Sequence, residues 1–304
     1  MKILVTGAGG FVGSHLLDIL EENNVQVVAV DMTVNSNLTE RKNVKTICCN
    51  LDEVDKLPEL IEERYFDCCI HLAWQGANGP ARADSDIQIK NIQRTLNLCK
   101  ILPQLNVKRF VGIGTLAEKD TLNYIPNDGA TPNAVACYGV AKMSAQYMSK
   151  ITCTSLGIEH IWCQLSNLYG VGDNTSNFIN FASKLMLEGK RASFTSGEQM
   201  YDFVYISDIA KGIFLASTKG KSNTCYYIGS GNQRKLKYFI EDIRNAIDPT
   251  IQLYFGEIPF NGVCLPDNEF DCTKLEKDTG YKSSVSFEDG IRRTVNWLKE
   301  SVVK

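Results

Sequence analysis

Val5-Thr6-Gly7-Ala8-Gly9-Gly10-Phe11-Val12-Gly13 is the stretch that decides the fold of this chain. It follows a short apolar run and opens a helix-like segment. Gly7 permits a tight turn, Gly10 lets the backbone approach a pyrophosphate, and Gly13 lets the helix pack closely on the preceding strand. The first turn of that helix would offer unpaired N–H groups and a partial positive charge to phosphate. The stretch therefore predicts a phosphate-binding turn.

An acidic residue follows the second predicted strand. Asp31 lies 18 positions after Gly13, and no Arg or Lys follows it until Arg41. A carboxylate at this place can accept hydrogen bonds from both ribose hydroxyls and repels a 2′-phosphate. The sequence therefore predicts NAD(H), rather than NADP(H), as the cofactor. Asn50-Leu51, after the third predicted strand, could contact the adenine edge, although Asn50 could equally cap a helix.

Strand-like and helix-like segments alternate around this turn. Near-continuous apolar strands separated by helices indicate an α/β fold with a parallel sheet covered on both faces, and the connection rules favour a doubly wound, Rossmann-type sheet. Six strands are predicted, at Lys2–Thr6, Gln26–Val30, Lys45–Cys49, Phe66–Leu72, Arg109–Ile113 and Glu159–Leu165. The helices between them are predicted to begin near Phe11, Leu51, Asp84 and Tyr138.

The alternation loosens in the second half of the chain. Short strands are predicted at Phe203–Ile206, Cys225–Ile228 and Gln252–Phe255, and helices at Asn177–Leu187, from Asp208, from Lys235, and at Phe287–Lys299. We expect a dinucleotide-binding domain over residues 1–166 and a smaller mixed α/β substrate lobe over residues 167–304. The chain could cross between the two lobes more than once.

Composition excludes several classes of protein. The 304 residues are 44% hydrophobic and 22% charged, which is typical of a globular chain and not of a disordered one. The net charge of -3 lacks the basic excess of a nucleic-acid-binding protein. No apolar run approaches the about 18 residues of a membrane span. Eleven cysteines, an odd number without a signal peptide, favour a reducing cytoplasm. Only three histidines and no CxxC argue against a metal site.

Tyr138 and Lys142 stand four residues apart and would share one face of a helix. A free tyrosine has a pKa of about 10, which makes it a poor proton donor or acceptor at neutral pH. A nearby ammonium and an oxidised nicotinamide would favour the phenolate and lower that pKa. Thr115, at the end of the fifth predicted strand, could hold the reacting oxygen near Tyr138, or could simply cap a helix. The sequence thus predicts Thr115, Tyr138 and Lys142 as catalytic residues.

Together these features resemble the extended short-chain dehydrogenases/reductases, the group of NAD-dependent sugar epimerases, dehydratases and ketoreductases. The resemblance covers nearly the whole chain. Besides the glycine turn and Thr115, Tyr138 and Lys142, it includes His71-Leu72-Ala73, Asn91-Ile-Gln-Arg-Thr95, Asn167-Leu168-Tyr169-Gly170, Asp202-Phe203-Val204-Tyr205-Ile206 and Gly290-Ile291 with Trp297.

The resemblance implies hydride transfer between nicotinamide and a sugar carbon. Tyr138 would move the hydroxyl proton, Lys142 would bind the nicotinamide ribose, and Thr115 would orient the sugar oxygen. Cofactor contacts would come from Gly7, Gly10, Phe11, Val12, Gly13, Asp31, Asn50, Leu51, Leu72, Ala73, Trp74, Leu165 and Ser166, with Asn91 supporting Lys142 or its neighbouring loop. Substrate contacts would come from Trp74, Thr115, Asn167 and Tyr201.

Departures from the family pattern limit which of the family's reactions this chain is expected to catalyse. Dehydratases carry an Asp-Glu pair after the threonine, where this chain has Leu116 and Ala117, so dehydration is not expected. Glu118 is one residue further on and should face elsewhere. Many members have an Arg at the positions of Gln164 and Tyr201, and the second usually meets the sugar-nucleotide diphosphate. Lys184, Lys190 or Arg191 could replace it, or the activating group could be held differently.

Four functions remain open at this level. His71-Leu-Ala-Trp-Gln-Gly76 and Gly112-Ile-Gly-Thr-Leu-Ala-Glu118 look like the branch that reduces nucleotide-linked 4-keto-6-deoxysugars. A nucleotide-sugar 4-epimerase is the alternative, since epimerases retain NAD. A reductase of a non-nucleotide substrate and a non-catalytic NAD(H)-sensing protein are further alternatives. We also expect a homodimer, paired through helices near Asp84–Ile101 and Tyr138–Leu156.

Overall fold

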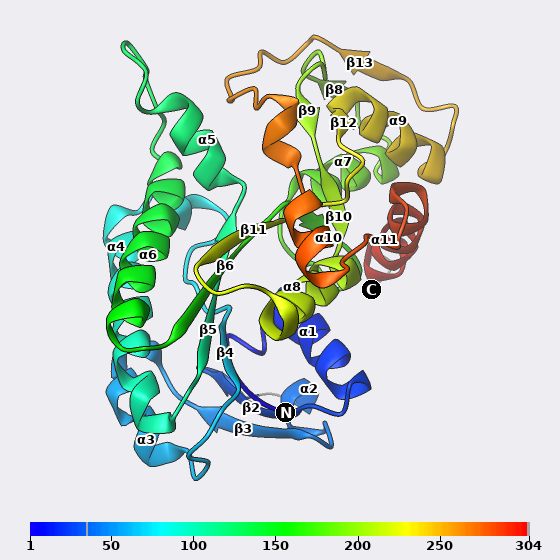
Figure 1. Cartoon of the computed structure of the whole chain (residues 1–304). Coiled ribbons are helices and arrows are strands. Elements are labelled where there is room, and N and C mark those ends of the chain that lie inside the picture. The colour runs from blue at the N-terminus through cyan, green and yellow to red at the C-terminus, as the bar shows by residue number, and fades with distance from the viewer. Residues whose placement is uncertain (35, 303–304) are drawn as a thin grey trace.

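The computed structural model describes residues 1–34 and 36–302 and contains a seven-stranded sheet in the order β11-β6-β5-β4-β1-β2-β3 (Figure 1). Every neighbouring pair in it is parallel. The order reverses between β1 and β4, which makes the sheet doubly wound and confirms the predicted fold class. The strands are β1 (Lys2–Thr6), β2 (Gln26–Asp31), β3 (Val44–Cys48), β4 (Cys68–His71), β5 (Arg109–Thr115), β6 (Glu159–Leu165) and β11 (Thr224–Ile228).

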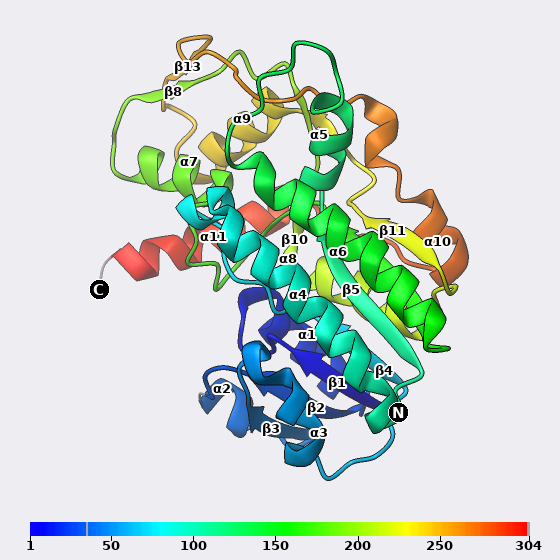
Figure 2. The same ribbon diagram turned by 90° about the vertical axis from the view of Figure 1, so that its left-hand side faces the viewer.

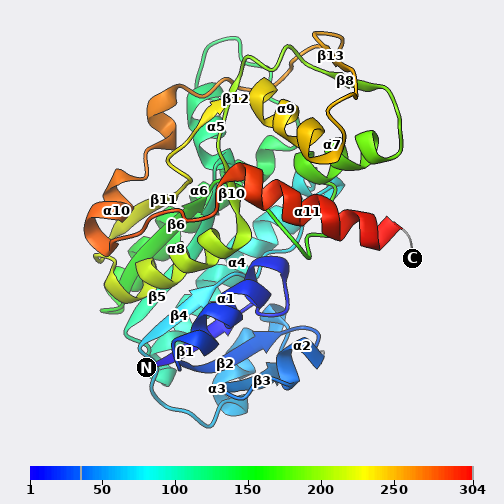
Figure 3. The same ribbon diagram turned by 90° about the vertical axis from the view of Figure 1, so that its right-hand side faces the viewer.

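Helices cover both faces of this sheet. Figure 2 shows α4 (Ser85–Ile101) and α6 (Ala136–Ser155) side by side on one face, and Figure 3 shows α1 (Phe11–Glu22) and α8 (Ile206–Lys219) on the other. Because successive side chains along a strand point to opposite faces of the sheet, each strand contributes to the apolar core on both faces. In β1, Val5 joins the core that contains Leu16 of α1, whereas Leu4 joins the core that contains Leu98 of α4. This is why apolar residues follow one another in β1, as in Ile3-Leu4-Val5.

The six strands predicted in the first half are present, with ends that move by at most two residues. The helix predicted from Leu51 is different: it consists of a 3-10 segment, η1 (Leu51–Lys56), and a short helix, α3 (Leu57–Leu60). Glu53 has non-helical backbone angles within η1, and Pro58, which has no N–H, stands in the first turn of α3. One continuous helix therefore does not form. A further short helix, α2 (Ser36–Thr39), precedes β3.

The second half builds a lobe above the carboxyl ends of the strands (Figure 1). Its small sheets pair segments that are distant in sequence, and strands of two or three residues carry no periodic signal, so several were not predicted. The elements are β7 (Asn167–Tyr169), α7 (Phe178–Leu187), β8 (Ala192–Phe194), β9 (Met200–Tyr201), β10 (Phe203–Tyr205), β12 (Arg234–Lys235), α9 (Leu236–Ile247), β13 (Leu253–Phe255), α10 (Thr273–Thr279) and α11 (Phe287–Val302).

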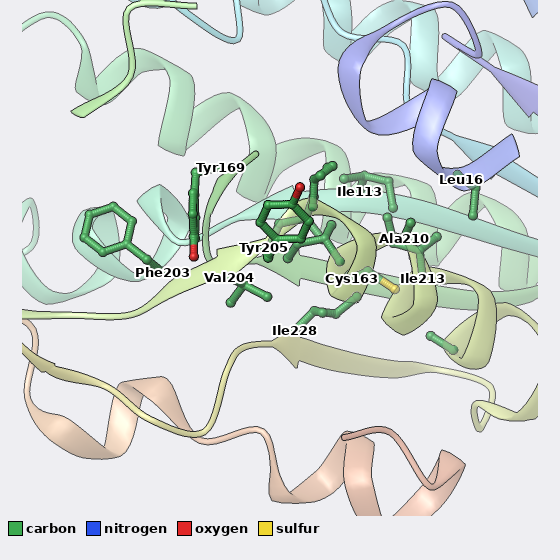
Figure 4. Close-up of a cluster of buried hydrophobic side chains, with 14 of the residues drawn as sticks. Leu16, Ile113, Cys163, Tyr169, Phe203, Val204, Tyr205, Ala210, Ile213 and Ile228 are labelled. Carbon is green, nitrogen blue, oxygen red and sulfur yellow. The ribbon is translucent and has the colours of Figure 1, made fainter. Parts of the chain in front are cut away.

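The chain returns to the main sheet within this half, since α8 covers one face and β11 forms the edge strand beside β6. Figure 4 shows the apolar side chains that join the two parts, with Val204 and Ile213 close to Cys163 and Ile228. The boundary at residue 167 stays a prediction. Within the described residues, 1–34 and 36–302, no helix is both long and apolar enough to cross a bilayer.

Candidate active site

Two cavities lie at the carboxyl ends of the strands, beside the point where the strand order reverses. One has a volume of about 400 Å³ and the other about 680 Å³. Ligands of open α/β sheets bind at such a switch point. Every residue that the sequence assigned to the site lines one of them. The smaller is lined by Asp31, Asn50, Leu51, Ala73 and Asn91, the larger by Phe11, Val12, Gly13, Thr115, Tyr138, Lys142, Leu165, Ser166, Asn167 and Tyr201, and both by Gly7, Gly10, Leu72 and Trp74.

The glycine turn sits between the two cavities. Gly7 has a φ of 72°, and a Cβ there would lie 2.6 Å from the Ala73 nitrogen. A Cβ on Gly13 would lie 2.5 Å from the carbonyl oxygens of Gly7 and Ala8. Helix α1 begins after Gly10 without a side-chain cap and with no acidic residue in its first turn. Its first N–H groups are therefore available to a diphosphate, so these residues fit a dinucleotide.

Asp31 ends β2 at the rim of the smaller cavity. One of its carboxylate oxygens, Oδ2, accepts a hydrogen bond from the Gly9 N–H at 2.8 Å, which ties the carboxylate to the glycine turn. Asn50 lines the same cavity, and its Oδ1 accepts a hydrogen bond from the Asp52 N–H at 3.0 Å. The capping alternative for Asn50 is therefore present in the structure, together with a position at the cavity. The carboxylate of Asp31 is placed to receive ribose hydroxyls.

The loop after β4 forms the wall between the cavities. Asn91 of α4 holds it, because its side chain accepts from the Gln75 N–H at 3.1 Å and donates to the Gln75 carbonyl at 2.7 Å. Trp74 donates its indole N–H to Gln88 at 2.9 Å. Its ring lies 3.8 Å from the Lys142 ammonium and packs edge-on against Tyr138. Asn91 therefore supports the loop, and Trp74 is fixed beside the predicted catalytic pair.

Tyr138 and Lys142 are brought to the larger cavity by the first two turns of α6 and are almost completely buried. The Lys142 Nζ donates to the Ile113 carbonyl oxygen near the end of β5 at 2.7 Å. Thr115, the last residue of β5, lines the same cavity and lies within hydrogen-bonding reach of Tyr138. The fold therefore gathers a phenol, an ammonium and a hydroxyl at one place.

Burial is the largest influence on the pKa of Tyr138. It raises this pKa to about 12, and the charge that opposes the rise comes from Arg82. Burial also lowers the pKa of Lys142 to about 7, and its ammonium is directed to the Ile113 carbonyl. That Lys142 and an oxidised nicotinamide together lower the pKa of Tyr138 stays a prediction.

Thr115 also lies just before helix α5 (Ala117–Tyr124), whose N-cap residue is Leu116. Its Oγ1 accepts from the Ala117 N–H at 3.3 Å, while the Glu118 carboxylate accepts from the Thr115 N–H at 2.8 Å. This Thr-x-x-Glu arrangement resembles a capping box, so the capping alternative for Thr115 is present as well. Glu118 points behind the strand and does not line the cavity, as expected.

The opposite wall of the larger cavity is held from behind by Asp202. Its backbone carbonyl accepts from Ser166 at 2.7 Å and from Asn167 at 3.3 Å, and its buried carboxylate accepts from Tyr227 at 2.9 Å. Tyr201 lines the cavity where many family members have an arginine. The three suggested basic replacements do not line the cavity: Lys184 is exposed on α7, Lys190 pairs with Glu188 and Arg191 pairs with Glu257.

Sequence reasoning missed Arg82, in the 3-10 segment η2 (Pro80–Ala83). Its guanidinium lies 4.5 Å from the centre of the Tyr138 ring. Its Nε is buried without a hydrogen-bond partner, and Arg82 and Lys142 are the cationic side chains among the described residues of the larger cavity. No motif marks a lone arginine in a Gly/Pro-rich loop, so only the fold reveals it.

Comparison with known proteins gives a family match over most of the chain. A family model described as "NAD dependent epimerase/dehydratase family" matches residues 3–229. A putative UDP-glucose 4-epimerase of Methanocaldococcus jannaschii is 29% identical over 98% of this chain and 99% of the relative. The dTDP-glucose 4,6-dehydratase of Salmonella typhimurium is 25% identical over 98% of this chain and 92% of the relative.

A solved structure has the same fold. The UDP-glucose 4-epimerase of Thermotoga maritima, crystallised with UDP-glucose, superimposes with a TM-score of 0.80 and 23% sequence identity. The match covers 99% of this chain and all of that one. The whole architecture, including the lobe above the sheet, is therefore shared.

Proposed function

This chain belongs to the NAD-dependent epimerase/dehydratase family, and on that premise we propose that it uses NADH to reduce the 4-keto group of a nucleotide-linked 4-keto-6-deoxyhexose. It is an NAD-dependent enzyme of the short-chain dehydrogenase/reductase type, so the non-catalytic NAD(H)-sensing alternative is set aside. Tyr138 and Thr115, opening together on one cavity with no dehydratase acid pair beside them, are the observation that carries the proposal.

Each of these residues has a separate role in the proposed reduction. Gly10, Gly13 and the start of α1 hold the cofactor diphosphate, and Asp31 accepts from the adenine-side ribose. When bound, NADH supplies the hydride that reaches the carbonyl carbon. Tyr138 donates its hydroxyl proton to the carbonyl oxygen, which Thr115 holds in place by a second hydrogen bond. Lys142 holds the nicotinamide ribose. Hydride and proton together convert the ketone to an alcohol.

Tyr138 is suited to act as a general acid. Burial raises its pKa, which favours the protonated phenol that a reduction requires. An epimerase would use the same phenol in both of its half-reactions. Trp74 and Arg82 also crowd Tyr138 from two sides, which favours presentation of one face of the sugar.

A nucleotide-sugar 4-epimerase is the second candidate. It is favoured by a specific observation: the relative that matches nearly the full chain at 29% identity is a putative UDP-glucose 4-epimerase. Dehydration is disfavoured, because Leu116 and Ala117 cannot donate or accept protons. The two candidates differ in whether the nicotinamide is consumed.

Absorbance of NADH separates them. The purified protein is mixed with NADH and a 4-keto-6-deoxy sugar nucleotide, or with NAD and the corresponding UDP-, dTDP-, CDP- and GDP-hexoses. A reductase oxidises one NADH for each ketone reduced. Sugar interconversion with no net change in nicotinamide absorbance would support the epimerase and overturn the reductase.

We further propose that Arg82 binds an anionic oxygen of the sugar nucleotide, in place of the arginine that Tyr201 replaces. Its unpartnered Nε and its stacking on Tyr138 support this role. For Arg82→Gln we expect KM for the sugar nucleotide to rise roughly tenfold to a hundredfold, since a hydrogen bond to a charged group is worth about 1.5–3 kcal/mol. Initial rates over a range of substrate concentrations measure it.

Two further variants sharpen this test. Arg82→Lys retains the charge and should recover part of the affinity. Lys184→Gln removes an exposed cation of α7 outside the cavity and should leave KM unchanged. If Arg82→Gln instead lowers kcat and leaves KM unaltered, Arg82 acts only on Tyr138. That result would contradict the proposed contact between Arg82 and the substrate.

A further inference from the structure

Glu118 is a fully buried carboxylate behind the active site, and the mechanism above does not use it. Its carboxylate accepts from the Thr115 N–H at 2.8 Å, from the Gln164 side-chain amide at 2.8 Å and from the Trp162 indole N–H at 3.1 Å. A capping box needs only the first of these bonds and is normally open to solvent. The complete enclosure of this group therefore needs another explanation.

The strand is shaped to admit this carboxylate. A Cβ on Gly114 would lie 2.4 Å from the Glu118 Oε1 and 2.2 Å from the Trp162 Nε1. A Cβ on Gly112 would likewise collide with the Trp162 ring at 2.2 Å. Both glycines lie in β5, which also presents the Ile113 carbonyl to Lys142. The end of β5 thus has Glu118 behind it and the Lys142 ammonium beside it.

The hydrogen-bond donors around Glu118 are all neutral, and Gln164 is one of them. Burial raises the pKa of Glu118, and its three donors and the Lys142 ammonium oppose this rise. Lys142 and Glu118 are held by neighbouring parts of β5, because Lys142 binds the Ile113 carbonyl and Glu118 binds the Thr115 N–H. The buried cation that can stabilise the carboxylate is therefore Lys142.

We infer that Glu118 is a positioning residue that serves Lys142 and Thr115 at once. It holds the end of β5 through the Thr115 N–H, and its negative charge favours the ammonium form of the buried Lys142. An isolated buried ammonium tends to lose its proton, and a nearby carboxylate opposes that loss. The ammonium can then donate hydrogen bonds, both to the Ile113 carbonyl and to a ribose hydroxyl. This second contact rests on the proposed function.

The other titratable groups around Glu118 do not change the sign of this effect. Burial holds the pKa of Tyr138 and of Cys225 at about 12 and lowers that of His71, which interacts with Lys142, to about 3, so all three are neutral near pH 7. The pKa of Lys142 is lowered to about 7 by burial, and Glu118 opposes this lowering. Removing the negative charge should therefore shift the deprotonation of Lys142 to lower pH.

The first test is a double-mutant cycle in thermal unfolding, which needs neither cofactor nor substrate. Glu118→Gln keeps the size and an acceptor oxygen but removes the charge, and Lys142→Met removes the ammonium. Each single variant leaves one buried charge without its counterpart. We expect the double variant to lose clearly less Tm than the sum of the two single losses. Additive losses would overturn the charge pairing, whatever the enzyme's substrate proves to be.

The second test follows NADH binding from pH 5.5 to 8.5 by fluorescence. In Glu118→Gln, affinity should be close to that of the unaltered protein at pH 5.5 and roughly tenfold weaker at pH 8, because the ammonium is lost earlier. Gln164→Leu is the matched control: it removes one hydrogen bond to Glu118 and leaves the charge. Its pH profile should keep its midpoint.

Parallel pH profiles in Glu118→Gln and the unaltered protein would reduce Glu118 to a structural cap. Coupling in the unfolding cycle without a pH-dependent change in NADH binding would instead keep the charge pair and remove the Lys142–ribose contact from the proposed function. The two failures are therefore distinguishable.

Discussion

Tyr138 is the residue on which the proposed chemistry depends. Its phenol is buried beside Thr115, and its ring has Arg82 above it and Trp74 at its edge. Two of these neighbours, Trp74 and Arg82, come from the loop that follows β4. The spacing of residues within α6 does not predict them. The identity of the proton donor is therefore a property of the sequence, whereas its protonation state is set by neighbours from other parts of the chain.

Replacement of Tyr138 by Phe removes the proton donor and keeps the ring. We expect Tyr138→Phe to lose about 10²–10⁴-fold in kcat, the usual size of general acid catalysis. NADH binding, measured by fluorescence, should stay close to that of the unaltered protein.

Tyr147 provides the control for this prediction, because it is an exposed tyrosine on the same helix. Tyr147→Phe should be fully active. An active Tyr138→Phe enzyme would exclude the mechanism, even if the fold and the cofactor were correct.

In the β1–α1 unit, Gly10 and Gly13 belong to one motif but have different roles. Gly13 packs α1 against its own turn, since any Cβ there meets two backbone oxygens at 2.5 Å. At Gly10 the nearest atom to a Cβ is the Gly7 oxygen, at 3.4 Å, and φ is −74°. Gly13 is thus needed for folding, whereas Gly10 keeps the approach to phosphate open.

This difference predicts opposite behaviour of two alanine variants. Gly13→Ala should lower the free energy of unfolding by about 1–3 kcal/mol, the usual cost of overpacking. Gly10→Ala should unfold at nearly the same temperature as the unaltered protein but bind NADH more weakly. Thermal unfolding and NADH fluorescence measure the two properties separately. Equal loss of stability in both variants would contradict this division.

The motif at the end of β4 also combines residues with different roles. His71, part of the family-like His-Leu-Ala motif, hydrogen-bonds to Thr6 at 2.7 Å and to Thr95 at 3.0 Å. Burial lowers its pKa to about 3, so it is neutral. It joins β1, β4 and α4 directly beneath the cavity wall. The motif therefore has a structural part, His71, and a cavity-lining part, Leu72 and Ala73.

Helices α4 and α6 lie side by side on one side of the protein (Figure 2), and both carry exposed apolar side chains. Ile151 is 71% exposed and Ile89 63% exposed, and exposed Tyr147 and Met148 lie on the same pair of helices. Large exposed apolar side chains grouped on one face mark an interaction surface. They support the proposed homodimer through α4 and α6.

A charge on this surface should separate the subunits. We expect the unaltered protein to sediment as a dimer and Ile151→Glu as a monomer. Tyr238→Glu places the same charge at an exposed aromatic residue of α9, in the other lobe, and should remain dimeric. A monomeric unaltered protein, or a dimeric Ile151→Glu variant, would exclude this interface.

The main sheet and the identity of the reacting groups can be predicted from the amino-acid sequence. Apolar runs such as Ile3–Val5 are visible without coordinates, because burial on both faces of the sheet favours apolar residues at successive positions. The glycine turn, Asp31, Tyr138 and Lys142 are equally visible, since each depends on a fixed spacing within one strand–turn–helix unit or one helix face.

The charges around those groups are visible only in the folded protein. Arg82 reaches Tyr138 from the short 3-10 segment η2, and Glu118 meets Gln164 and Trp162 of β6. Such contacts join residues far apart in the chain and leave no periodic pattern. Electrostatic energies also depend on distance and burial, which a one-dimensional sequence does not contain.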